Sequence, residues 1–321
     1  RAGQRPPETF PFWGVLAVPG GIVDYSYFAD TDPVAPGKLE RIDNLVDGVA
    51  LDFGYAGALL TSTSWSGAVS GSVLLDYDDD LRVISEDVAG SVIGYSYADA
   101  DGLLTQAGAL SLSLDPDTAL LTGTSLGGVT DSISYNGFAE PVSYTASHNG
   151  TPLYTMTLSY DALGRIVHKT EEALGVTTGY AYVYDEAGRL SEVHSGAGDC
   201  GVISCSFAAS YEYDPNGNRT SVTEGGPPVT ASYDAQDRLL SYGSASYGYT
   251  AAGELSSKTD ASGTTGFVYD VLGNLRSVSL PSGTTVSYVV DGLNRRVAKK
   301  LDGVMQKAWL YGGAPGPIAE L

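Results

Sequence analysis

The heptapeptide Tyr184-Asp185-Glu186-Ala187-Gly188-Arg189-Leu190 decides the fold, because near-copies of it recur along the chain. Clear copies are YDALGRI at 160–166, YDPNGNR at 213–219 and YDVLGNL at 269–275, and degenerate copies lie at 233–239, 249–255 and 290–296. Recurrence about every twenty residues predicts an array of small similar hairpins instead of one closed globular core. Such an array also argues against an enzyme.

The motif combines a Tyr-Asp pair with a glycine three residues after the aspartate and, in the best copies, an arginine next to the glycine. Its members, predicted to have structural roles, are Tyr160, Asp161, Gly164, Arg165, Tyr184, Asp185, Gly188, Arg189, Tyr213, Asp214, Gly217, Tyr233, Asp234, Tyr269, Asp270 and Gly273. The aspartate suits the first position of a type I turn, where its carboxylate accepts a hydrogen bond from the backbone two residues later. The glycine tolerates a positive φ. Each copy therefore predicts two short strands joined by a turn with a glycine bulge.

Tyrosines alternate with other residues in the strand before the turn, as at Tyr180, Tyr182 and Tyr184. A spacing of two puts these rings on one face of a strand. We expect most of the rings to pack on one another across strands. The alternative is that rows of rings bind a sugar or an apolar segment of another chain.

The first half of the chain carries the same pattern in weaker form over residues 20–150, before the clear repeats of 155–321. About thirteen repeats, and hence about twenty-six strands, are predicted, in a single continuous region over residues 1–321. A sheet of that many strands must curl, so the predicted fold is an all-β hairpin array curling into a spiral or a hollow shell. A helix over 161–175 is rejected because the neighbouring copies lack helical spacing.

Composition narrows the function classes. The 321 residues include 41 glycines and only 17% charged residues, which suits turns and strands and disfavours helical bundles. The formal net charge of −21 repels phosphates, so neither nucleic acid nor an anionic membrane is an expected partner. No apolar run reaches the roughly eighteen residues of a membrane-spanning helix. Prolines near both ends, and Arg1 in place of an initiator methionine, indicate a fragment of a longer protein.

Basic residues concentrate in one late stretch of this acidic chain. They are Arg295, Arg296, Lys299, Lys300 and Lys307. We interpret the stretch as a solvated strand face, with a docking patch as the alternative.

The two cysteines, Cys200 and Cys205, lie in a loop rich in glycine and serine between two copies of the motif. Their spacing suits a disulfide across a hairpin end, provided that the Cβ atoms face each other. A disulfide implies an oxidising compartment. Two free thiols are the alternative, and the absence of a second pair argues against a zinc site.

Residues that could carry chemistry are scattered. His148, His168 and His194 fall in different repeats without metal-ligand spacing. The acidic cluster of Asp76 and 78–80 lacks the pattern of a calcium loop and is interpreted as a solvated turn. The glycines of 123–128 are not followed by the lysine of a phosphate loop. We therefore predict no catalytic residue, no cofactor and no metal site.

The motif copies resemble the YD repeats of the RHS family, which the teneurins and the C subunits of insecticidal toxin complexes share. The likeness is clearest at 160–166, 184–190, 213–219 and 269–275, and it extends to DGLNRRVAKK at 291–300, to WLY at 309–311 and to IAEL at 318–321. The resemblance implies YD-repeat strands that wind as a β-sheet spiral into a hollow shell. Bacterial members enclose a toxic domain, others mediate contact at the cell surface, and the repeat has been linked with carbohydrate binding. The family's plug with its self-cleavage site, and its toxic domain, would lie beyond Leu321.

The resemblance implies a secreted or surface-exposed bacterial scaffold that encapsulates or presents a polypeptide cargo, as a toxin delivery shell does. Its expected partners are that cargo or other repeat subunits, and its expected location is extracellular or at the cell surface. The alternative is a cell-surface adhesin or glycan-binding structural protein that forms filaments. A polysaccharide-active enzyme would need two converging carboxylates, of which the sequence gives no sign.

Overall fold

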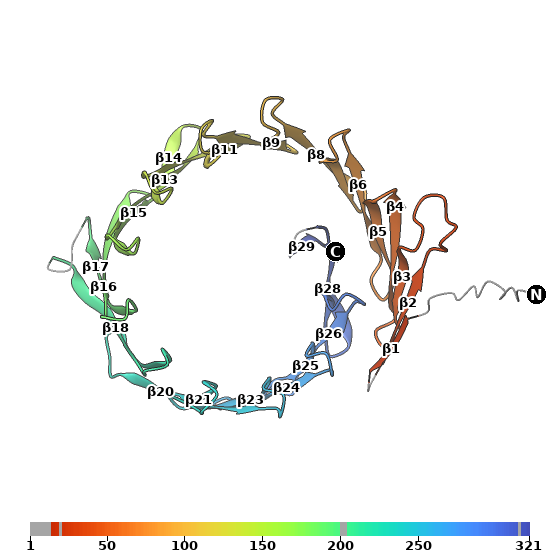
Figure 1. The fold of residues 1–321 in the computed structure, drawn as a ribbon. Coiled ribbons are helices and arrows are strands. Elements are labelled where there is room, and N and C mark those ends of the chain that lie inside the picture. The colour runs from red at the N-terminus through yellow and green to blue at the C-terminus, as the bar shows by residue number, and fades with distance from the viewer. Residues whose placement is uncertain (1–13, 19–20, 200–203, 314–315) are drawn as a thin grey trace, which may run out of the picture. The chain divides into compact units, whose positions relative to one another are not determined.

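The computed structural model describes residues 14–18, 21–199, 204–313 and 316–321. In these ranges it contains 29 β-strands and no helix. The repeat count predicts about twenty-six strands. Accordingly, nothing in the described ranges has the helical length and hydrophobicity that a bilayer crossing requires. The rejected helix over 161–175 is strand β15 (Ile166–Ala173) and its flanking turns. Most of the strands are labelled in Figure 1.

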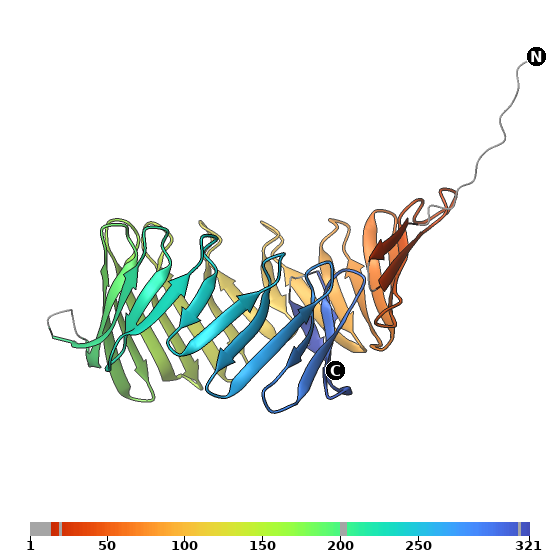
Figure 2. The same ribbon diagram turned by 90° about the horizontal axis from the view of Figure 1, so that it is seen from below.

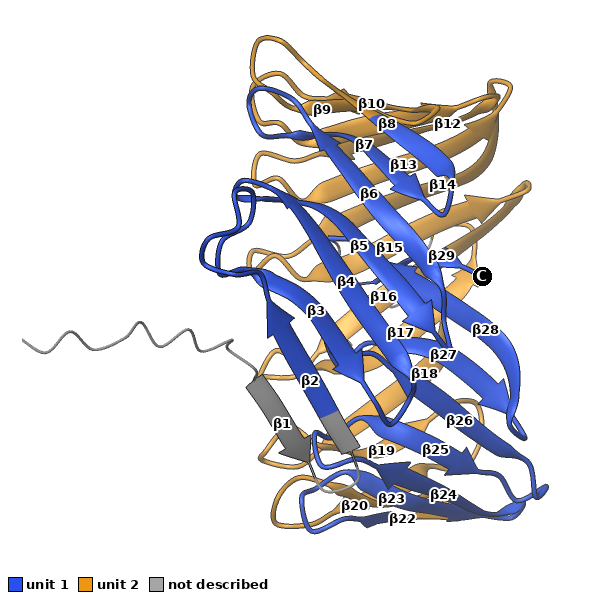
Figure 3. Ribbon diagram, turned by 90° about the vertical axis from the view of Figure 1, so that its right-hand side faces the viewer, with its two compact units in different colours: residues 1–94, 248–321 blue, residues 95–247 orange. Residues whose placement is uncertain are grey.

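The chain divides into two compact units, coloured separately in Figure 3. Unit 1 comprises residues 1–94 and 248–321, and unit 2 comprises residues 95–247. The division falls within β8 (Ser91–Tyr97) and within β22 (Ala245–Tyr249).

The remaining strands of unit 1 come from both ends of the chain. They are β1 (Gly14–Val18), β2 (Gly21–Tyr27), β3 (Leu39–Asn44), β4 (Val49–Ala56), β5 (Leu59–Gly67), β6 (Gly71–Tyr77), β7 (Val83–Val88), β23 (Leu255–Asp260), β24 (Gly263–Tyr269), β25 (Leu275–Ser279), β26 (Thr285–Val290), β27 (Arg296–Leu301), β28 (Val304–Tyr311) and β29 (Pro317–Glu320).

Unit 2 is continuous in sequence. Besides the ends of β8 and β22, its strands are β9 (Leu104–Ala107), β10 (Leu110–Leu114), β11 (Leu121–Leu126), β12 (Val129–Tyr135), β13 (Pro141–His148), β14 (Thr151–Tyr160), β15, β16 (Val176–Tyr184), β17 (Leu190–Ala197), β18 (Ser206–Tyr213), β19 (Arg219–Thr223), β20 (Val229–Tyr233) and β21 (Leu239–Tyr242).

Pairing in both units is antiparallel between strands that follow one another in sequence, as in β14–β15–β16. The motif tyrosine sits at a register shift, for example between Val183 and Tyr184 where β16 meets β17. The turn that follows needs one residue with positive φ, and Gly188 supplies it with φ 81°. Two degenerate copies use Asp237 and Asn294 there, with φ 58° and 60°. Short polar side chains tolerate this left-handed conformation, which explains why those copies keep the turn without glycine.

Unit 2 is a sheet one layer thick. Figure 2 shows its strands running between two edges, with hairpin turns along each edge. Among its described residues only four apolar side chains are buried, those of Ala181, Cys205, Ala209 and Val222. A central hydrophobic core therefore does not hold this unit together.

Unit 1, in contrast, has a hydrophobic core between strands that are far apart in sequence. Side chains of β2 to β6, such as Ile42 and Leu51, pack with Val297 and Leu310 of β27 and β28, and all four are fully buried. Strand β28 lies beside β6 (Figure 3). Full burial of one such aliphatic side chain stabilises a fold by about 1.5–3 kcal/mol.

The two layers of unit 1 approach each other closely at Gly292. A Cβ atom added at this glycine would lie 2.1 Å from the Cγ2 atom of Ile42, a separation that van der Waals repulsion forbids. The position therefore requires glycine because of packing.

We predict that Gly292→Ala lowers the free energy of unfolding by about 1–3 kcal/mol, the usual cost of overpacking a filled core. Urea denaturation followed by circular dichroism measures this change. The matched control is Gly266→Ala in β24, where an added Cβ has no heavy atom within 4 Å. Equal stability of the two variants would contradict the tight contact at Gly292.

Candidate functional site: the contacts between repeats

The motif aspartate closes its own turn through both carboxylate oxygens. In the turn after β16, Asp185 Oδ1 accepts the backbone N–H of Arg189 at 2.8 Å, and Oδ2 accepts the guanidinium Nε–H at 2.8 Å. Asp161 and Arg165 repeat this pair at 3.0 and 2.7 Å. The residue after the glycine is therefore a partner of the aspartate, whereas the sequence pattern indicated only that it is polar.

These hydrogen bonds favour the ionised carboxylate. The backbone N–H and the side chain of Arg189 hold the pKa of Asp185 below its ordinary value of 3.8, against the opposing effect of desolvation. In the copies at 213 and 269 an asparagine replaces the arginine. Its amide then donates to the aspartate, at 3.0 Å both from Asn218 to Asp214 and from Asn274 to Asp270.

The motif tyrosine links its repeat to the preceding one. The hydroxyl of Tyr184 donates a hydrogen bond to the carbonyl oxygen of Ile166 at 2.7 Å, and that of Tyr213 donates to Leu190 at 2.8 Å. In each case the acceptor is the residue two positions after the glycine of the preceding copy. The same bond joins Tyr77 to Leu60, Tyr135 to Leu121, Tyr160 to Pro141, Tyr233 to Arg219 and Tyr311 to Arg296.

The turn arginine makes a second contact between repeats. The guanidinium carbon of Arg165 lies 4.6 Å from the ring centre of Tyr184, and that of Arg189 lies 4.7 Å from the ring of Tyr213. Arg189 Nη1 also donates to the carbonyl oxygen of Asp214 at 2.9 Å. One arginine thus holds its own aspartate and stacks on the next tyrosine.

The expectation that most rings pack on one another is wrong for the motif tyrosines, which mainly contact carbonyls and arginines. Ring stacking does occur between Tyr180 and Tyr182 of β16, whose centres are 6.5 Å apart with planes 9° apart. A neighbouring carboxylate organises this part of the sheet, because the hydroxyls of Tyr154 and Tyr180 each donate to Glu171 at 3.0 Å. Lys169 pairs with Glu171 at 2.5 Å and lowers the pKa of that carboxyl.

One copy of the motif is buried in unit 1. Asp291 keeps the turn contacts, with Arg295 Nε donating at 2.9 Å, but it is 1% exposed. Trp65 Nε1 donates to its Oδ2 at 3.5 Å. The guanidinium of Arg295 lies between rings, 5.3 Å from Trp65 and 5.0 Å from Tyr311. A buried carboxylate needs such partners, because desolvating an unpaired charge is costly.

Polar contacts also join the turn after β3 to the late strands of unit 1. Arg276 forms a two-pronged ion pair with Asp47, whose side chain is 8% exposed, with one N–O distance of 2.6 Å. Asn44 Nδ2 donates to the carbonyl oxygen of Val290 at 2.9 Å. The partners are 246 residues apart in the Asn44–Val290 pair and 229 residues apart in the Asp47–Arg276 pair, so no local pattern could have revealed the pairs.

Two of the three histidines lie closer together than their repeats suggested. His168 and His194 both stand opposite Ala181, on β15 and β17. His194 Nε2 lies 3.0 Å from Glu192 Oε2, and its ring meets the edge of Phe207. Within the described ranges no three His, Cys, Asp or Glu side chains form a group that could hold a metal ion.

The acidic cluster near residue 78 is a turn of the motif type. Asp78 Oδ1 accepts the backbone N–H of Asp80 and of Arg82, and Oδ2 accepts Arg82 Nε at 2.8 Å. Asp76 accepts a hydrogen bond from Ser85 on the paired strand. Asp76 and Asp78 thus stabilise the hairpin through these hydrogen bonds.

Cys205 is buried, and its Sγ lies 3.7 Å from the carbonyl oxygen of Gly179. Cys200 lies outside the described residues, so the Cys200–Cys205 disulfide stays a prediction.

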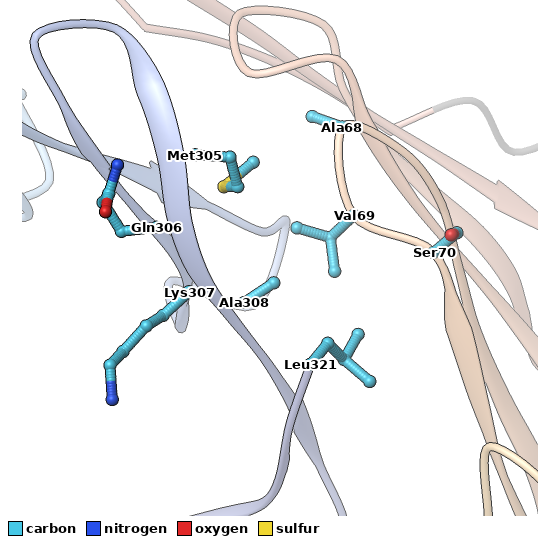
Figure 4. A pocket seen from close by; sticks show the side chains of 8 residues that line it. All are labelled: Ala68, Val69, Ser70, Met305, Gln306, Lys307, Ala308 and Leu321. Carbon is cyan, nitrogen blue, oxygen red and sulfur yellow. The ribbon is translucent and has the colours of Figure 1, made fainter.

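A shallow pocket of about 480 Å³ opens in unit 1 beside the start of β28 (Figure 4). It is lined by Ala68, Val69, Ser70, Met305, Gln306, Lys307, Ala308 and Leu321. Its ionisable side chain, Lys307, pairs with Glu320 at 2.7 Å. The lining therefore offers apolar contact and no catalytic grouping.

We predict that Tyr213→Phe lowers the free energy of unfolding by about 1 kcal/mol, because it leaves the carbonyl of Leu190 without its donor. Arg189→Ala should cost more, since it removes contacts to Asp185, to Asp214 and to the Tyr213 ring. Denaturant titration provides the measurement. The control is Tyr247→Phe, since the Tyr247 hydroxyl makes no hydrogen bond within the described ranges. If all three variants unfold like the parent, the link between repeats contributes nothing.

Protonation of the turn aspartates should weaken the fold. The pKa of Asp185 is lower in the folded chain than in the unfolded one, so its stabilisation is present at neutral pH and is lost as the pH falls below about 4. Asp185→Asn should lower stability at pH 7 and flatten its decline in acid. Thermal melts of this variant and of Glu186→Gln, an exposed neighbour, test the effect. Equal acid sensitivity in both variants would exclude this role of Asp185.

Comparison with known proteins supports one family. A family model for the teneurin YD-shell matches residues 16–319. Teneurin-1 of Gallus gallus is 30% identical over 236 residues, covering 70% of this chain and 8% of the teneurin. Teneurin-4 of Mus musculus is 28% identical over 261 residues, covering 78% and 9%. The chain therefore spans less than a tenth of the length of these relatives.

Solved structures agree on the fold. The crystal structure of TcdB2-TccC3-TEV superposes with a TM-score of 0.59 over 88% of this chain and 17% of that chain, at 14% identity. That of TcdB2-TccC3-Cdc42 gives 0.60 over 91% and 17%, at 12% identity. The predicted fold class, an all-β YD-repeat array of shell type, is confirmed. With a family model covering nearly the whole chain, the protein belongs to the teneurin YD-shell family.

Proposed function

We propose that this chain is wall material of a secreted or surface-exposed bacterial scaffold, which encloses or presents another polypeptide. The scaffold role follows from its YD-shell family. The observation that carries the proposal is the repeated link from motif tyrosines to the preceding repeat, exemplified by Tyr184 with Ile166 and Tyr213 with Leu190. Such links make a thin sheet that acts by shape and steric exclusion.

Two further observations support a guest polypeptide. Two of the solved structures that share this fold are TcdB2-TccC3-TEV and TcdB2-TccC3-Cdc42, which differ in the third component that they name. A scaffold that acts by its shape can combine with different polypeptides, and a third component that varies is consistent with such a role. In this chain the conspicuous acidic groups, such as Asp161 and Asp185, are engaged in holding turns.

The second candidate is a glycan-binding adhesin. The parallel rings of Tyr180 and Tyr182, beside Lys169, favour it, because stacked aromatic rings and charged groups suit sugar recognition. The Tyr180 hydroxyl and the Lys169 ammonium group, however, already bind Glu171. We therefore rank this function second.

Protease protection tests the proposal. When the chain is expressed in its complete reading frame, we expect the guest polypeptide to be digested by proteinase K at least about tenfold more slowly than the same polypeptide alone, since a closed conformation limits cleavage. The Arg189→Ala variant, with a loosened link between repeats, should protect less. Equal digestion of enclosed and free guest would refute the enclosing role. Strong binding on a glycan array without protection would favour the adhesin.

A further inference from the structure

Basic and aromatic side chains gather on one face of β26–β28 in unit 1. Tyr288 pairs in register with Lys299, which pairs in turn with Lys307, so the three side chains form a row on the same face. Arg296 lies over the Tyr288 ring, with its guanidinium carbon 4.0 Å from the ring centre. We call these four residues the basic face.

The basic face points away from the core of unit 1. In the same strands Val289 pairs with Ala298, and Ala298 pairs with Ala308. These three residues belong to the hydrophobic core. Because successive side chains of a strand point to opposite faces, Lys299 and Lys307 lie on the side away from that core.

The positive charge on this face is poorly compensated within the chain. Lys307 pairs with Glu320 at 2.7 Å. Within the described ranges no carboxylate oxygen comes within 4.0 Å of a side-chain nitrogen of Arg296 or Lys299. Moreover, Lys299 and Lys307 stand directly opposite each other, an arrangement that destabilises a sheet when both are charged. Uncompensated positive charge of this kind, in a chain of net charge −21, favours binding of an anionic partner.

The chemistry of the face favours an acidic polypeptide over a nucleic acid. Nucleic acids bind long tracks of cations that follow the phosphates, whereas this face has three cations on two strands. The overall charge of −21 repels an extended polyanion. The ring of Tyr288 and that of Trp309, the next residue on the same side of β28 as Lys307, supply apolar contact that a peptide side chain can use.

We propose that the basic face binds an acidic segment of the polypeptide that the scaffold encloses or presents. Carboxylates of that segment accept hydrogen bonds from Lys299 and Arg296, and its apolar side chains rest on Tyr288. The assignment rests on the proposed function for the nature of the partner. The docking-patch alternative of the sequence is thereby preferred for Arg296, Lys299 and Lys307, while Arg295 is committed to Asp291.

The test uses a fluorescein-labelled decapeptide of alternating glutamate and tyrosine, with binding followed by fluorescence anisotropy. We expect saturable binding at about 20 mM salt that weakens strongly at about 300 mM, because salt screens exposed charges. Lys299→Glu should weaken binding by about tenfold or more. The matched control is Lys300→Glu, the same charge change one residue along, which pairs with Ser287 on the opposite face. It should change the affinity by less than about twofold.

Three results would overturn the proposal. They are no saturable binding at low salt, equal weakening by Lys300→Glu and Lys299→Glu, and displacement of the peptide by a decamer of deoxythymidylate at equal or lower concentration. Near-ultraviolet circular dichroism establishes that both variants keep the parent fold. Protease protection is scored separately: a protected guest without peptide binding refutes this face alone, and peptide binding without protection refutes the enclosing role alone.

Discussion

The hydrogen bond from a motif tyrosine to the preceding repeat, with the arginine stacked on the same ring, is the interaction on which the array depends. In unit 2 almost no apolar side chain is fully buried, so hydrophobic burial contributes little there. A hairpin held by backbone pairing alone is only marginally stable in water. The contacts of Tyr184 with Ile166 and Arg165 fix one hairpin to the previous one.

Unit 1 shows what happens when a repeat meets a second layer. Its copy at 290–296 has Val290 in place of the tyrosine, and Gly292 lies where another side chain would collide with Ile42. Asp291 remains because the turn needs its carboxylate, and its burial is offset by Arg295 and Trp65. The glycine at position 292 of this copy therefore has a packing cause.

The same features account for the proposed role. The motif aspartates and arginines, which could carry chemistry in another fold, hold turns and join repeats in this one. The proposed partners would contact the surface of the sheet. The basic face of β26–β28 is a local exception on a chain of net charge −21, and this contrast underlies the proposed binding of an acidic segment.

The sequence by itself determined the hairpin array, because the turn chemistry is contained within seven residues. The aspartate that binds backbone two residues later, and the positive φ at Gly188 and its equivalents, are local properties. Asp237 and Asn294, which replace the glycine in two copies, also fit this local explanation, because aspartate and asparagine tolerate a positive φ.

Only the tertiary structure decided which repeats touch and where. The acceptor of the Tyr213 hydroxyl is Leu190, which lies 23 residues earlier, and Asp47 meets Arg276 across 229 residues. The polarity of a side chain indicates that it needs a hydrogen-bond or ionic partner. The identity of that partner depends on which strands lie next to each other in the folded chain. The motif has a similar sequence in both units. For that reason the sequence could not predict that unit 2 is a one-layer sheet whereas unit 1 has a packed core.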